Sequence, residues 1–181
     1  MTVTTFTRQY PLRVVEQIVN NHLRISSADG ELYDNAVRCV RNAIDAAEDY
    51  INMPICRTAV LIEGVAEPGE RVALNMANVT ASSIKLNGEV VNSDECIVAG
   101  STRNSYALLS SAYTGSVTYS IEAKAGYDDS TLPGAIYQAV ALMAGTFFEF
   151  RADNLSGTIT SELPRTAESL LNPYRIYPYE L

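Results

Sequence analysis

Residues 116–124 read Ser-Val-Thr-Tyr-Ser-Ile-Glu-Ala-Lys, and this stretch decides the fold class. Apolar side chains alternate with polar ones at every second position, which is the pattern of a strand that buries one face. Asn87-Gly88 indicates a hairpin, because a type I′ turn requires positive φ twice. The alternating pattern predicts antiparallel strands throughout residues 57–127. They are Thr58–Val65, Glu70–Leu74, Ser83–Leu86, Val90–Val91, Cys96–Val98, Tyr106–Leu109 and Gly115–Ala125.

Helical periodicity lies on both sides of this β-region. Pro11 opens a short helix, and a longer helix is predicted from about Glu31 to Ile51. After the β-region, one helix runs from Leu132 to about Asp153, and Pro164 opens a last helix through Leu171. We predict an α+β fold: a small helical bundle with an inserted antiparallel β-region and an extended C-terminal tail. The expected parts are a helical body of residues 1–56 and 128–172, an insertion of residues 57–127 and a tail of residues 173–181.

The C-terminal residues 170–181 read Leu-Leu-Asn-Pro-Tyr-Arg-Ile-Tyr-Pro-Tyr-Glu-Leu. The two prolines prevent a helix from continuing past Asn172. Tyrosine and arginine are the residue types that anchor protein interfaces. We therefore expect the tail to bind another protein; a tail that folds back onto its own domain is the alternative. The expected contact residues are Pro173, Tyr174, Arg175, Ile176, Tyr177 and Tyr179.

Composition restricts the class of protein. Apolar residues make up 47% and charged residues 19% of the 181 residues, which is typical of a globular chain. A net charge of −8 argues against a general nucleic-acid-binding surface. The three cysteines form no CxxC motif, which indicates reduced thiols and no structural metal. We expect a soluble protein without a secretory signal or membrane span, since the apolar run Ala139–Phe148 is too short to cross a bilayer.

Candidate catalytic residues are few. His22 is the only histidine, and a capped or partly buried structural role is expected for it. Asp128-Asp129 precedes a helix and is expected to form a turn and the helix entry. No glycine-rich phosphate loop is present. We expect no catalytic residues, no bound metal and no cofactor, and do not interpret the chain as an enzyme.

The helix predicted from Pro133 to Asp153 is apolar almost all round. A surface helix of a monomer usually has a wider polar face. This segment is therefore either the central core helix or a helix with one flank against a neighbouring subunit. Phe148 and Arg151 are the candidate residues for that subunit contact.

The order of several short motifs resembles the head–tail connector (adaptor) proteins of long-tailed double-stranded DNA bacteriophages. The motifs are His22-Leu23-Arg24-Ile25, Ala125-Gly126-Tyr127, Leu132-Pro133, Phe147-Phe148-Glu149-Phe150-Arg151, Glu162-Leu163-Pro164 and Leu170-Leu171-Asn172-Pro173-Tyr174-Arg175. This chain departs from the family by adding residues 176–181 and by lacking the usual Thr-Gly-Arg around residues 50–54.

The resemblance implies a structural virion protein at the head–tail junction, assembled in the host cytoplasm. Family members form a ring, here of about a dozen copies, which contacts the portal and the stopper or tail-completion protein. Genomic double-stranded DNA would pass through without specific binding, and an acidic lumen suits this role because it repels the duplex.

Two other classes of protein remain open. One is a stopper or tail-completion virion protein. The other is a small-molecule or carbohydrate-binding module, which needs exposed aromatic side chains in the β-region. The candidates are Tyr106, Tyr113, Tyr119 and Tyr127.

Overall fold

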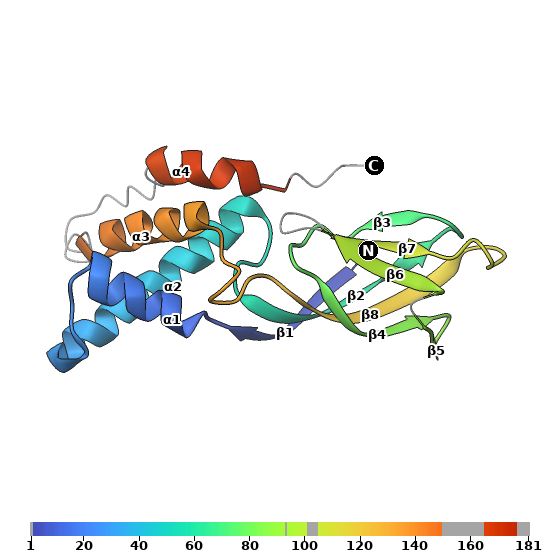
Figure 1. Ribbon diagram of the computed structural model, residues 1–181, viewed down its shortest axis with the longest axis horizontal. Coiled ribbons are helices and arrows are strands. Elements are labelled where there is room, and N and C mark those ends of the chain that lie inside the picture. Colours follow the sequence, from blue (N-terminus) through green and yellow to red (C-terminus); the bar gives the residue numbers. More distant parts are fainter. Residues whose placement is uncertain (1, 93, 101–104, 150–164, 177–181) are drawn as a thin grey trace, which may run out of the picture. The chain divides into compact units, whose positions relative to one another are not determined.

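The computed structural model describes residues 2–92, 94–100, 105–149 and 165–176, with only the backbone for residues 2–8. The chain folds as two compact units. One, the sheet unit, contains residues 2–9 and 56–127; the other, the helical unit, contains residues 10–55 and 128–176 (Figure 1). The predicted α+β class is confirmed.

The helical unit is built around α2 and α3. Helix α2 (Glu31–Ile51) has the bounds that the sequence predicts, and α3 (Gly134–Glu149) packs against both α2 and α4 (Arg165–Leu171). Alanines at fully buried positions let the helices approach closely. The remaining elements are α1 (Leu12–Gln17), the π-helical turn η1 (Ile18–His22) and the 3₁₀ turns η2 (Ser27–Asp29) and η4 (Asn172–Tyr174).

The limits of α2 have local causes. Ser26 and Asp29 form a capping box around η2, and Gly30 then turns the chain with a φ of 57°. Glu31 and Asp34 lie in the first turn, where the helix dipole favours negative charge. Asn52 ends the helix in the left-handed conformation, with a φ of 56°.

The sheet unit contains two antiparallel sheets. The larger has five strands in the order β1-β2-β8-β4-β5, and the smaller has three strands in the order β3-β7-β6. One hydrophobic core contains side chains from both sheets, among them Ile62, Leu109 and Ile121. The strands are β1 (Thr2–Gln9), β2 (Arg57–Ala66), β3 (Arg71–Ala73), β4 (Thr80–Leu86), β5 (Glu89–Val90), β6 (Cys96–Gly100), β7 (Ser105–Leu109) and β8 (Val117–Ala125).

The predicted hairpin and alternating strand are confirmed. Asn87 and Gly88 join β4 to β5 with φ values of 51° and 87°, as a type I′ turn requires. Along β8 every second residue from Val117 to Ala125 is buried.

The N-terminal residues belong to a different part of the chain from the one predicted. Residues 1–9 were expected in the helical body, but β1 pairs with β2 in the five-stranded sheet, from Thr2 opposite Glu63 to Gln9 opposite Arg57. The partner strand lies about fifty residues away along the chain, so no short-range pattern marks this pairing. None of the helices within the described residues is both long and apolar enough to cross a membrane.

Candidate interaction surfaces

The histidine does not form part of a metal cluster within the described residues. His22 ends the turn η1 and is exposed, which corrects the expectation of a capped or partly buried side chain. It lies beside α3, since a Cβ added at Gly145 would be 3.5 Å from His22 Nε2. The described part of the chain contains no group of three His, Cys, Asp or Glu side chains that could hold a metal ion.

Asp128 organises the turn before α3. One carboxylate oxygen accepts hydrogen bonds from Ser130 Oγ at 2.7 Å and Ser130 N at 2.9 Å, and from Thr131 N and Oγ1 at 3.0 Å. These donors, the Ser130 hydroxyl foremost, lower the pKa of Asp128 from 3.8 to about 2. Asp129 Oδ1 accepts from the Val14 backbone N–H at 3.2 Å and so links this turn to α1. The two aspartates therefore serve the turn and the helix entry, as the sequence predicts.

We expect Asp128→Asn to lower stability at neutral pH and to lose this effect in acid. The folded pKa, about 2, lies below the unfolded value near 3.8, so the ionised side chain stabilises the fold above about pH 4. That contribution disappears as the pH falls through about 2. Urea unfolding at pH 7 and pH 2.5 should show the gap between the variant and the natural protein shrinking in acid. Asp49→Asn, on the exposed side of α2, is the matched control; an equal gap at both pH values would contradict the assignment.

The segment after α4 lies on the C-terminal end of α2. The Ile176 backbone N–H donates to the Ile51 carbonyl at 2.8 Å, and Asn52 Nδ2 donates to the Ile176 carbonyl at 3.1 Å. Tyr50 Oη donates to Asn172 Oδ1 at 2.7 Å. Since the last carbonyls of a helix lack partners within the helix, the tail segment caps α2. We call this arrangement the tail clasp.

The tail clasp shows where part of the predicted partner contact lies. Pro173 and Tyr174 belong to the turn η4, and Arg175 is extended, with its guanidinium 5.0 Å from the centre of the Tyr50 ring. The side chains of Pro173 and Arg175 are exposed, and those of Tyr174 and Ile176 are half-buried. The start of the tail thus contacts its own helical unit, at α2. Tyr177 and Tyr179 lie outside the described residues.

Helix α3 is covered on more than one side within its unit. Ile136 and Val140 are buried on one stripe of the helix, and Ala141 and Ala144 are buried on the next. Phe148 is half-buried, and Arg151 lies outside the described residues. These facts favour the interpretation of α3 as the central core helix of the unit.

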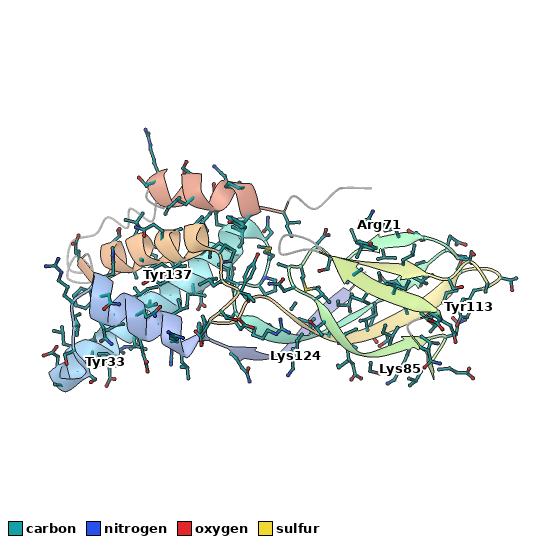
Figure 2. All side chains as sticks on the ribbon, viewed as in Figure 1. Tyr33, Arg71, Lys85, Tyr113, Lys124 and Tyr137 are labelled. Carbon is teal, nitrogen blue, oxygen red and sulfur yellow. The ribbon has the colours of Figure 1, made fainter. Side chains whose placement is uncertain are left out.

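The outer faces of the two sheets differ in character. On the five-stranded sheet, Thr118, Ser120, Glu122 and Lys124 project outward from β8. Lys85 Nζ lies 3.8 Å from the Glu122 carboxylate, and both side chains are partly exposed. Figure 2 labels Lys85 and Lys124 on this sheet and Arg71 on β3 of the other. This outer face is an ordinary polar surface of an antiparallel sheet.

The outer face of the three-stranded sheet is apolar. Ile97 lies opposite Leu108 across β6 and β7, and Ala99 lies opposite Tyr106. Ile97 is 48% and Leu108 38% exposed. The Arg71 guanidinium lies 3.7 Å from the centre of the Tyr106 ring, a close cation–π contact. We call this surface the apolar sheet face; its residues are Arg71, Ala73, Ile97, Ala99, Tyr106 and Leu108.

The sequence carries a signal for this surface that local hydrophobic period alone does not interpret. Residues 105–109 (Ser-Tyr-Ala-Leu-Leu) and 96–100 (Cys-Ile-Val-Ala-Gly) carry apolar side chains on both faces of their strands, unlike residues 116–124. Strands of that kind are typical of sheets buried on both sides.

The four tyrosines that were candidates for a carbohydrate-binding site do not form an exposed aromatic surface. Tyr119 and Tyr127 are buried, and Tyr106 and Tyr113 are half-buried. Tyr113 Oη donates to the Glu95 carboxylate, which raises the pKa of the tyrosine. The arrangement does not favour the binding-module alternative.

Comparison with known proteins gives matches among solved structures. No model of a protein family matches the chain, and no curated protein matches it. A chain from the virion of a native gene transfer agent particle superposes with a TM-score of 0.73 at 21% identity. Chains from the neck of an empty particle computed with C6 symmetry and of a native particle computed with C12 symmetry have TM-scores of 0.70 and 0.64, at 20% and 17% identity. Each match covers 98% of this chain and 96% of the other, so the shared fold includes both units.

Proposed function

We propose that this protein is a structural component of the head–tail neck of a tailed-phage-like particle. The observation that carries the proposal is the fold shared over 98% of the chain with chains from gene transfer agent necks. The shared region includes the β-region that is inserted between the helices. The motifs that resemble head–tail connectors support the same role.

The finer proposal is a ring of about a dozen copies below the portal, which extends the DNA channel and receives a stopper or tail-completion protein. The C6 and C12 symmetries used for the related necks support an assembly of repeated copies. The net charge of −8 suits a DNA conduit, because negative charge repels the duplex and lets it slide.

The tail is proposed to contact the portal through Pro173, Tyr174, Arg175, Ile176, Tyr177 and Tyr179. The tail clasp supports this by fixing the start of the tail on α2. A segment held at one end loses less conformational entropy when it binds, so a fixed start strengthens the contact. Because Pro173 and Arg175 are exposed within the clasp, a partner has access to both side chains.

Phe148 and Arg151 are proposed as part of the contact between subunits. Phe148 lies near the end of α3 and is half-buried, which leaves part of the ring for a neighbouring copy. Aromatic and arginine side chains are the usual anchors of such contacts.

A complementation series tests the proposed function. Deleting the gene from the particle-producing strain should leave heads that do not join to tails, and restored particles should contain the protein next to the portal. Joined particles in the deletion strain would refute the neck role, and a position remote from the portal would indicate a stopper.

Two shortened chains separate folding from portal binding in the same series. A chain ending at Ile176 keeps the tail clasp, so it should unfold like the whole chain yet fail to restore joined particles. A chain ending at Asn172 loses the bonds to Ile51 and Asn52 and should be destabilised by about 1–3 kcal/mol. Thermal unfolding and particle counts measure the two effects. Full restoration by the chain ending at Ile176 would show that residues 177–181 do not bind the portal.

A further inference from the structure

We propose that the apolar sheet face of one copy binds the start of α2 on a second copy of this chain. The inference rests on the proposed ring and assigns two of the surfaces that join its subunits.

The sheet face has the composition of a buried surface. Along β7 the inward residues Ala107 and Leu109 are buried in the core, while the outward residues Tyr106 and Leu108 are also apolar. The outward side of the other sheet carries Thr, Ser, Glu and Lys at the matching positions of β8. An apolar outer face beside a polar one in the same unit marks a surface that another molecule covers.

Arg71 indicates that the partner surface carries negative charge. Its guanidinium stacks on Tyr106, and within the described part of the chain it has no ion-pair partner. A stacked guanidinium presents its N–H donors at the ring edge in a fixed orientation, which suits a carboxylate. The face therefore fits a partner surface that combines apolar and acidic side chains.

The start of α2 is such a surface on this chain. Glu31 and Asp34 are exposed and, being three residues apart, lie on the same face of the helix, and Leu32, next to Glu31, is 38% exposed. Neither carboxylate has an ion-pair partner among the described residues. We call Glu31, Leu32 and Asp34 the acidic helix start.

The two surfaces are unlike each other, as a ring requires. In a ring each copy offers one surface to the preceding neighbour and a different surface to the next. The apolar sheet face carries the positive charge of Arg71, and the acidic helix start carries the negative charges of Glu31 and Asp34, so the two surfaces are complementary between copies. The chain has a net charge of −8, so two copies that meet in an arbitrary orientation repel each other. A positive side chain such as Arg71 therefore favours the one orientation in which it meets a carboxylate.

A charge-exchange experiment tests the pairing. Arg71→Glu should lower the number of copies per purified particle about tenfold or more, the effect of removing an interface anchor. Lys124→Glu, a matched reversal on the polar sheet face, should leave it within about twofold. Combining Arg71→Glu with Glu31→Arg or with Asp34→Arg should restore at least about half of the copies, because the charges are exchanged across the same contact. Ile97→Ser tests the apolar part without changing charge and should also reduce assembly.

Thermal unfolding of each variant shows whether it is folded. If Arg71→Glu does not fold, Ile97→Ser takes its place as the test of the sheet face. Assembly of Arg71→Glu at the natural level would overturn the role of the sheet face. Loss of assembly that neither acidic variant restores would show that the sheet face binds a different protein, which overturns the second copy as partner. Absence of the natural protein from particles would refute the proposed function, and the ring contact with it.

Discussion

Replacing Ile121 with alanine should destabilise the sheet unit by about 2–5 kcal/mol, one of the two largest effects expected in this protein. Ile121 is fully buried at the centre of β8, where it pairs with Ile62 of β2 on one side and Ile84 of β4 on the other. Removing three carbon atoms leaves a cavity between two sheets, and strands held by hydrogen bonds cannot move together to close it.

Urea unfolding followed by hydrogen exchange measures this effect. Protection should fall for amides of β2, β4 and β8, because these strands share the core. Val65→Ala, on the neighbouring strand β2 and 64% exposed, is the control and should change stability by less than about 0.5 kcal/mol. Equal stabilities for the two variants would mean that Ile121 does not lie in the core of the sheets.

Replacing Ile136 with alanine should destabilise the helical unit by a similar amount, about 2–5 kcal/mol. Ile136 is fully buried on α3, the helix that packs against both α2 and α4. Truncation therefore opens a cavity in the core of the helical unit.

Gln138→Ala is the matched control for this prediction, since Gln138 is exposed on the same helix and alanine favours helix. Hydrogen exchange should show loss of protection in α2 and α3, with the strands of the sheet unit little changed if the two compact units unfold independently. A uniform loss over the whole chain would show that the two units unfold together.

Elements with a strong local signal were predictable. The hydrophobic period of α2, its acidic first turn and its ending before Pro54 are each recorded by residues close to one another in the chain. The same holds for the Asn87-Gly88 turn and the alternation along β8. Each signal depends on φ preferences and side-chain spacing, which neighbouring residues determine.

The candidate surfaces were predictable only in part. Tyrosine and arginine in the tail indicated a binding segment, but the cap that Ile176 provides depends on the carbonyl of Ile51, far away in sequence. Likewise, the apolar strands β6 and β7 were recognised as strands, while the exposure of Ile97 and Leu108 depends on which of their two faces the core covers.

The sequence by itself determined the order of helices and strands after β1, the acidic charge and the absence of a phosphate loop, because each of these is a property of composition or of residues close in the chain. Tertiary structure alone decided that β1 joins the sheet unit, that the strands divide into two sheets, and that the tail caps α2. Those outcomes depend on which backbone groups, distant in sequence, form hydrogen bonds with each other and on which apolar faces are buried against each other. The free energy of such pairings is distributed over residues far apart in the chain, so no local pattern records it.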